Sequence, residues 1–206
     1  MIAIVDYETS HAAEVRAAFE SVGVTATIAG AIEQLDRASK IVLPPTATFS
    51  RAVRSIRDRG LVPPLMRAVD QGRPILGIGH GLHLLFDVSY EEGQHTGLGV
   101  IPGKVTRFDF GDHPVRLSVP TSHQGFSSVH WSQPCTLFNG ITSGSSFYFD
   151  HRFYADPLDP RIISAIAHHG IDFSAAVVQG SIAGLQFLPH LSEEAGRQIL
   201  RNFAKM

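Results

Sequence analysis

The chain has 206 residues, 44% of them hydrophobic, with a net charge of −2 and an isoelectric point near 6.6. Such a chain can bury one sizeable core, so we expect a single domain over residues 1–206. The near-neutral charge gives no electrostatic reason to expect nucleic acid or an anionic membrane as a partner, which leaves small molecules and proteins.

The N-terminal segment and the cysteine content bear on location. Residues 1–6 lack the basic region and cleavage site of a signal peptide, and no apolar run approaches membrane-spanning length. A single cysteine, Cys135, excludes an internal disulfide and is typical of a reducing compartment. We therefore expect a cytoplasmic protein.

Short apolar strands alternate with helical patterns in the first part of the chain. The strands are expected at residues 2–5, 25–29, 41–43 and 74–78, and the helices at 12–22, 49–57 and 61–71. This order predicts an α/β fold with an open, mostly parallel sheet and helices on both faces. Catalytic groups in that architecture lie at the carboxyl ends of the strands.

Residues 74–87 carry the most specific local pattern. A short apolar run is followed by glycines at 77, 79 and 81, and then by the apolar face of an expected helix at 82 and 84–86. The pattern predicts a nucleophile elbow, a sharp strand-to-helix turn whose apex residue is strained and exposes its side chain. The apex here is Gly79, so the turn is present and the nucleophile is absent.

After Gly97 the sequence changes to strands separated by Gly and Pro. Strands are expected at residues 115–119, 126–131, 147–149, 162–167, 173–179 and 182–187, and a last helix at 192–204. Residues 169–172 and 179–180 are typical of hairpin turns. The C-terminal half should therefore add antiparallel strands to the same domain.

A set of blocks follows one family pattern in order over essentially the whole chain: residues 4–7, 43–44, 74–86, 91–93, 97–103, 147–151, 175–177 and 184–187. In these blocks the chain resembles the glutaminase subunit of imidazole glycerol phosphate synthase, a class I glutamine amidotransferase. The resemblance implies a flavodoxin-like sheet and a cytoplasmic subunit of histidine biosynthesis. It also implies a heterodimer with a barrel-type cyclase or synthase, and no cofactor.

The residues that carry the family's chemistry do not match. The family uses a cysteine at the elbow apex with a histidine and a glutamate, and the corresponding residues here are Gly79, Leu188 and His190. A thioester needs a thiolate and a base. We therefore expect a degenerate triad and no glutaminase activity.

The oxyanion loop and the substrate contacts differ as well. The family's Pro-Gly-x-Gly is replaced by a degenerate loop in which Pro45 has no N–H and Ala47, after Thr46, resists a positive φ. The family's glutamine after the elbow is replaced by His83, and a serine or threonine is replaced by Arg152.

A new constellation is a second hypothesis for the former active site. His80 and His83 are neighbours on one helical turn, and His190 ends a strand that faces the same region. Three imidazoles could bind a transition metal. The spacing alone is not a ligand signature, so the simpler interpretation is polar filling of a vacated pocket, and we assign no metal. Arg152 is expected at the rim of this candidate cleft.

Other polar residues have simpler interpretations. His123 resembles a family position near the partner interface, and a structural role is equally open. Tyr148 and His151 are further interface candidates, with a structural role favoured for His151; Asp150 should point to the opposite face of the strand. We expect solvent exposure for His168, His169 and the arginines at 51, 54, 57 and 59, and an incidental or buried thiol for Cys135.

Two functions of different class follow. The first is a pseudo-glutaminase that docks on a barrel-type partner to stabilise it, regulate it or seal its ammonia entrance. The alternative is an enzyme of changed chemistry that uses the histidine-lined cleft. An active glutaminase of histidine biosynthesis is third, because overall similarity alone would suggest it.

Overall fold

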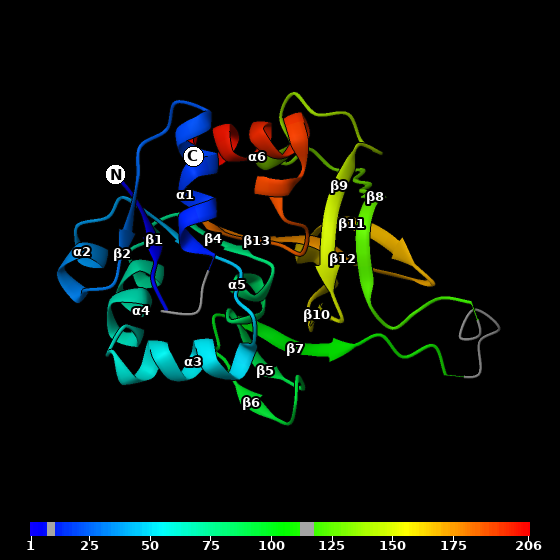
Figure 1. The fold of residues 1–206 in the computed structure, drawn as a ribbon, viewed down its shortest axis with the longest axis horizontal. Coiled ribbons are helices and arrows are strands. Elements are labelled where there is room, and N and C mark those ends of the chain that lie inside the picture. The colour runs from blue at the N-terminus through cyan, green and yellow to red at the C-terminus, as the bar shows by residue number, and fades with distance from the viewer. Residues whose placement is uncertain (8–10, 112–117) are drawn as a thin grey trace.

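The computed structural model describes residues 1–7, 11–111 and 118–206, and its main feature is a seven-stranded sheet (Figure 1). Five neighbouring strands are parallel, and two more are added through hairpins, each pairing antiparallel with the strand before it in the sheet. The expected open, mostly parallel sheet is confirmed. In spatial order the strands are β2 (Ala26–Ala29), β1 (Ile2–Val5), β3 (Lys40–Leu43), β4 (Ile75–Ile78), β13 (Ile182–Leu185), β12 (Ile171–Gln179) and β11 (Ile163–His169).

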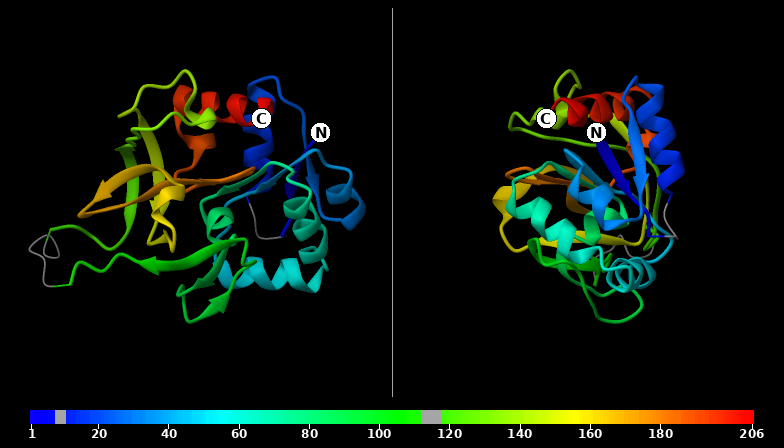
Figure 2. Two further views of the ribbon diagram at one scale, coloured as in Figure 1. Left: turned by 180° about the vertical axis from the view of Figure 1, so that it is seen from behind. Right: turned by 90° about the vertical axis from the view of Figure 1, so that its left-hand side faces the viewer.

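Helices cover both faces of this sheet (Figures 1 and 2). All four residues of β1 are apolar because both faces of the strand are buried. Ile2 and Ile4 belong to one hydrophobic core, and Ala3 and Val5 belong to the other. Strands buried on both faces read as continuous apolar runs. The first core contains α1 (Ala12–Ser21) and α6 (Glu193–Lys205), and the second contains α2 (Ile32–Asp36), α3 (Phe49–Asp58) and α4 (Val62–Asp70).

Two smaller sheets complete the described parts of the chain. One has the order β10 (Phe153–Pro157), β7 (Ile101–Arg107), β5 (Phe86–Ser89) and β6 (His95–Thr96), and the other pairs β8 (His123–Ser128) with β9 (Ser146–His151). Short 3₁₀ turns are η2 (Thr136–Phe138), η3 (Pro160–Ile162) and η4 (Pro189–Leu191). None of the helices in the described residues is both long and apolar enough to cross a membrane.

The segment after the elbow corrects one prediction. Helix α5 spans only His80–His83, and Phe86 begins a strand instead of extending the helix. The chain leaves the helix because the carbonyls of Leu84 and Leu85 accept N–H groups from Leu98 and Val100, each at 2.8 Å. The apolar residues after the elbow are therefore buried by a neighbouring segment and not by a helical face.

Further differences concern the C-terminal half. The expected strand at 115–119 falls mostly outside the described residues, and 118–119 form a turn and a bend. The strands expected at 126–131 and 182–187 end earlier, at Ser128 and Leu185. Helix α2 and strands β5, β6, β7 and β10 were not predicted. Both hairpin turns are confirmed, with Gly170 at φ +74° and Gly180 at φ +61°.

Candidate functional site

The elbow has the predicted geometry at the carboxyl end of β4. Gly79 has φ +56° and ψ −118°, a combination that glycine adopts far more readily than other residues. Its N–H donates to the carbonyl of Leu185 at 2.8 Å, and its carbonyl accepts the N–H of Leu82 at 3.0 Å. The strained apex is thus anchored on both sides although it carries no side chain.

Packing explains a neighbouring glycine but not the one at the apex. A Cβ on Gly81 would lie 1.9 Å from the carbonyl oxygen of Leu43, so the fold requires glycine there. A Cβ on Gly79 would lie 3.2 Å from Leu188 Cδ2 and 3.5 Å from Pro45 Cβ. Apart from its φ, the apex therefore leaves nearly enough room for a side chain, and the absence of a nucleophile is not forced by packing.

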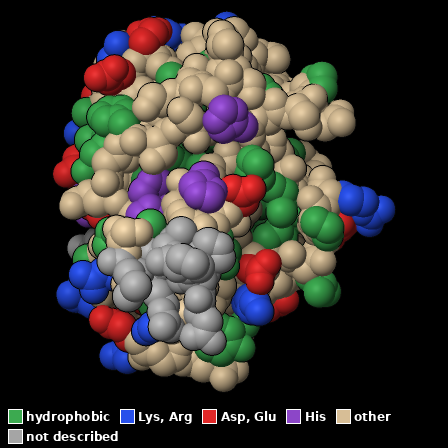
Figure 3. Space-filling view, turned by 90° about the vertical axis from the view of Figure 1, so that its right-hand side faces the viewer, with side chains coloured by type: hydrophobic (Ala, Val, Ile, Leu, Met, Phe, Trp, Pro, Cys, Tyr) green, Lys and Arg blue, Asp and Glu red, His purple; other side chains and the backbone are tan. Residues whose placement is uncertain are grey.

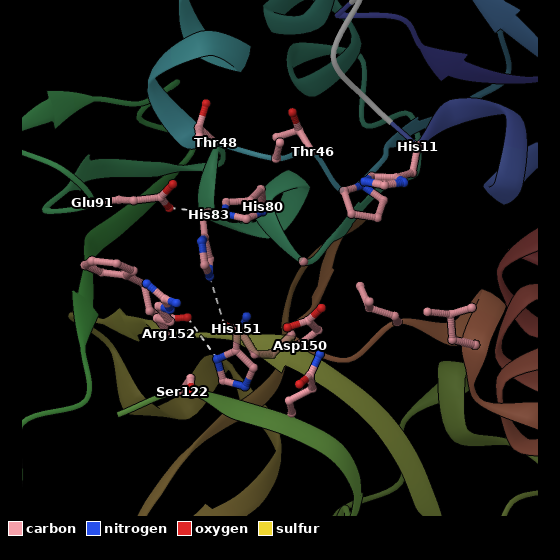
Figure 4. A pocket seen from close by; sticks show the side chains of 18 of the residues that line it. His11, Thr46, Thr48, His80, His83, Glu91, Ser122, Asp150, His151 and Arg152 are labelled. Carbon is pink, nitrogen blue, oxygen red and sulfur yellow. Dashed lines mark hydrogen bonds and ion pairs between the residues drawn. The ribbon is translucent and has the colours of Figure 1, made fainter. Parts of the chain in front are cut away.

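A cleft of about 770 Å³ opens in front of the elbow (Figure 4). The loops after three parallel strands line one side, with Pro45 after β3, Gly79 after β4 and Leu188 after β13. The ends of β7 and β9 contribute Arg107 and His151. The cleft thus lies at the carboxyl ends of the parallel strands, where this architecture places ligands.

The residues at the three positions that the resemblance assigns to the triad all line the cleft, and neither Gly79 nor Leu188 carries a nucleophile or a base. Leu188 stands beside the apex, held by donation of its N–H to the carbonyl of Tyr148 at 2.8 Å. His190 lies in η4 and its buried Nδ1 has no partner among the described residues. Burial lowers the pKa of His190 to about 4, against a smaller raising effect of Glu14, so the ring is neutral at pH 7.

The loop after β3 borders the cleft and has no backbone donor at Pro45. Pro45 is buried, has no N–H, and its carbonyl accepts the N–H of His11 at 3.0 Å. Thr46 is buried and Ala47 is exposed without a positive φ. All three expected loop residues line the cleft.

The two elbow histidines converge with an acidic residue that the sequence analysis did not select. His80 Nε2 lies 3.1 Å from Glu91 Oε2, and the His80 and His83 rings meet edge to face with centroids 5.4 Å apart. One ligand atom from each of these three residues lies within 4.8 Å of the others. His190 lines the same cleft as His80 and His83, as expected, but it is not part of this group, so the three imidazoles do not converge on one point. In the sequence, Glu91 was marked only by its place in the block at residues 91–93 that resembles the family pattern.

Burial and neighbouring charges set the protonation of this group. Burial, with a further contribution from His80, lowers the pKa of His83 to about 4, although its bond to Gln186 acts in the opposite direction. Burial alone would raise the pKa of Glu91, but the hydrogen bond and charge of His80, with the N–H of Phe49, lower it. A neutral His83 and an ionised Glu91 result at pH 7.

A second histidine cluster lies on the other side of the cleft. His151 Nδ1–H donates to the carbonyl of Phe153 at 3.0 Å, so its Nε2 accepts from His123 Nδ1–H at 3.2 Å. His123 Nε2 then accepts from the Ser127 hydroxyl at 2.8 Å. Burial and His169 lower the pKa of His123 to about 4, and burial and His123 hold the pKa of His151 well below its usual value.

The contacts of this cluster bear on the expected exposures. His169 is half-buried and stacks on His123 at 4.5 Å, so the expectation of a solvated His169 was wrong. His168 is exposed and pairs with Asp172 at 2.8 Å. The imidazoles of His123 and His151 are buried, and Tyr148 is half-buried. The interface roles of these three residues stay predictions.

Histidine side chains also reach the surface seen in Figure 3, close to acidic ones.

The remaining candidates are distributed as follows. Arg152 is exposed and lines the cleft, and Asp150 is exposed where its neighbour His151 is buried. Arg59 is not a solvated side chain, because it donates to the carbonyls at Asp6 (2.8 Å) and Gly30 (3.1 Å). Arg51 and Arg54 are exposed, Arg57 donates to the carbonyl of Thr96, and Cys135 is a free, half-buried thiol.

Comparisons with known proteins agree with the fold and with the resemblance. The family model for glutamine amidotransferase class I matches residues 3–206. The chain is 38% identical to imidazole glycerol phosphate synthase subunit HisH of Syntrophotalea carbinolica, over all of both chains. It is 36% identical to the HisH subunit of Geobacter metallireducens, over 98% of this chain and 97% of that one.

Solved structures show the same architecture at lower sequence identity. PurLQS from Thermotoga maritima superposes with a TM-score of 0.75 at 18% identity, over 99% of this chain and 97% of that one. A structure described as a glutamine amidotransferase gives 0.73 at 18% identity, over the full length of both. The chain therefore belongs to the class I glutamine amidotransferase family and has that family's mostly parallel sheet with flanking helices.

Proposed function

We propose that this protein is a glutaminase-type subunit that has lost glutamine hydrolysis and acts by docking on a barrel-type cyclase or synthase partner. The observation that carries the proposal is the fully formed elbow with Gly79 at its apex and Leu188 packed beside it. The backbone of an acyl-transfer site is kept, and its nucleophile and base are missing.

The chemistry argues against hydrolysis by a related route. Removing the nucleophile or the base of such a triad costs a factor of about 10⁶ in turnover. A missing oxyanion donor costs about 3 to 4 kcal/mol more. Cys135 does not replace the lost thiol, because it lies next to η2 and does not line the cleft.

The docking role is supported by the relatives. Those from Syntrophotalea carbinolica and Geobacter metallireducens are named as subunits of imidazole glycerol phosphate synthase, and the chain matches them over nearly its full length. Glycines that the elbow backbone requires, such as Gly81, persist without the catalytic residues. We expect this pattern in a protein whose fold and surface are needed but whose catalytic residues are not. A heterodimer in the cytoplasm, in histidine biosynthesis or a related pathway, follows from this proposal.

Binding to a barrel-type cyclase encoded in the same genome tests the proposal. We expect the two purified proteins to form a one-to-one complex at micromolar concentrations, measured by sedimentation velocity. The complex should convert the cyclase substrate with ammonium salts and not with glutamine. Independent sedimentation of the two proteins would contradict the docking role, and glutamine-dependent turnover would contradict the loss of hydrolysis.

A second candidate function is supported by the convergence of His80, His83 and Glu91 on the cleft. The cleft volume of about 770 Å³ is within the range of small-molecule sites. An enzyme of changed chemistry would use these groups on a new substrate. His80→Ala separates the candidates, because docking should survive this substitution and the new chemistry should not.

A further inference from the structure

We propose that His80, His83 and Glu91 form a binding site for one divalent first-row transition cation, such as Zn²⁺, with an open coordination position facing the cleft. All three residues line the cleft, and their ligand atoms come within 4.8 Å of one another. The proposal rests on this geometry and does not depend on the docking role.

The spacing of the three groups is close to that of a metal site (Figure 4). Bond lengths of about 2.0 to 2.1 Å in a tetrahedral site put neighbouring ligand atoms about 3.3 to 3.4 Å apart. His80 Nε2 and Glu91 Oε2 are already 3.1 Å apart. His83 is on the same helical turn as His80, so a shift of about 1.5 Å or less completes the set.

Surrounding residues orient the two buried ligands. Glu91 Oε1 accepts the N–H of Phe49, the first residue of α3, at 3.0 Å, which leaves Oε2 for His80 and the cation. Gln186 Oε1 faces His83 Nε2 at 3.0 Å, and because a carbonyl oxygen only accepts, Nε2 carries the hydrogen. Holding a histidine by its second nitrogen in this way is usual for metal-ligating imidazoles.

The remaining nitrogen of His83 is the observation that points to a ligand. In a neutral ring with the hydrogen on Nε2, Nδ1 carries a lone pair. Nδ1 is buried and has no hydrogen-bond partner among the described residues, and His83 as a residue is 1% exposed. A His80–Glu91 ion pair would account for those two residues but would leave this acceptor unpaired. A cation bound by all three residues pairs it.

The donor set selects the kind of cation. Two imidazole nitrogens and one carboxylate oxygen suit zinc and other first-row transition ions, whereas Mg²⁺ and Ca²⁺ prefer oxygen ligands. Three protein ligands with one open position are typical of catalytic zinc sites, and the same set of two histidines and one carboxylate also binds non-haem Fe²⁺. The side chains of His80 and Glu91 are 21% and 9% exposed, so a bound cation would be reachable from the cleft.

His190 provides a matched control in the same cleft. Its imidazole also has a buried Nδ1 without a partner in the described chain. It lines the cleft but is not within ligand distance of the other three groups. Loss of His190 should therefore leave cation binding unchanged.

The test is metal binding by untagged protein after treatment with a chelator. Zn²⁺ is titrated in competition with a chromophoric chelator, and Co²⁺ absorption reports the coordination geometry. Anaerobic Fe²⁺ titration distinguishes an iron site from a zinc site. We expect one ion per chain, with affinity reduced at least about 10-fold in His80→Gln, His83→Gln and Glu91→Gln. His190→Gln and Cys135→Ala should bind like the unsubstituted protein.

Glu91→Gln is informative because its amide oxygen can still accept from Phe49, so the start of α3 keeps its partner. Metal-free thermal unfolding establishes that each variant is folded. If Glu91→Gln does not fold, His80→Gln, which alters a partly exposed ring, makes the same distinction. Absence of stoichiometric binding to the unsubstituted protein, or equal losses in His190→Gln and His80→Gln, would overturn the proposal.

Discussion

The elbow and the neighbouring wall of the cleft differ in what they have kept. The elbow, residues 77–81, has the strained backbone of a nucleophile site with no reactive side chain at Gly79. The wall formed by His80, His83 and Glu91 has three polar groups whose ligand atoms lie within 4.8 Å of one another. The first region has the backbone geometry of a nucleophile site, and the second brings three polar side chains together at the cleft.

This difference shows that two kinds of constraint act within one site. Gly77 and Gly81 are required by backbone atoms less than 3 Å from where a Cβ would lie, so they are needed whether or not the protein is catalytic. Side chains that face the open cleft have no such requirement and can change together. The glycines that the backbone requires therefore identify the family, whereas the activity has to be inferred from the side chains that face the cleft.

The largest expected effect is on the elbow backbone. Gly81→Ala places a Cβ in α5 1.9 Å from the carbonyl oxygen of Leu43, which is fixed in the central strand β3. We expect at least about 3 kcal/mol of destabilisation or failure to fold, measured by urea unfolding. Gly180→Ala is the control: a Cβ there would have nothing within 4 Å, and only its positive φ, which Gly81 does not share, carries a cost of about 1 kcal/mol. Similar costs for the two variants would contradict the steric account.

The apex should tolerate a side chain without gaining activity. Gly79→Cys meets Leu188 at 3.2 Å and keeps a φ of +56°, which should cost about 1 to 2 kcal/mol. The thiol would have no base at Leu188 and no donor at Pro45, so we expect no glutamate release from glutamine. Measurable turnover in this single variant would show that another residue acts as the base or that the loop supplies a donor.

The smallest expected effect is a change in pH dependence caused by His190. Its folded-state pKa of about 4 lies below the unfolded value of about 6.5, so the unfolded chain binds an extra proton between these values. Stability is thus fully present above pH 6.5 and falls as the pH decreases toward 4. We expect His190→Gln to reduce the loss of unfolding free energy between pH 7 and pH 5 by about 1 kcal/mol, after allowance for the partial exposure of the ring. Equal losses in both proteins would contradict a neutral, buried His190.

Much of the sheet could be predicted from the sequence. Strands such as β1 and β4 are short, continuous apolar runs because both faces are buried, and alternate glycines marked the elbow. Helix α5 was overestimated because the apolar run after Gly81 is equally compatible with burial against residues 97–101. Gly97 lets that segment approach Phe86, because a Cβ there would meet the Phe86 carbonyl oxygen. This requirement is visible in the structure but could not be recognised from the sequence.

The candidate site was only partly predictable. His80 and His83 followed from their position on one turn, but Glu91 is brought to them by β5, which was not predicted. His190 was expected to join them because it follows the strand that neighbours the elbow. The turn η4 instead places it near His11 and Glu14, whose charges influence its pKa. Sequence spacing could not determine this direction.

The most direct test of the central claim is the release of glutamate from glutamine by the purified protein. The assay is run with the protein alone and with a barrel-type cyclase partner, alongside an active HisH relative and the Cys135→Ala variant. The absence of a nucleophile at Gly79 predicts a rate equal to background in every sample except the active relative. A rate that scales with protein concentration and survives Cys135→Ala would contradict the account.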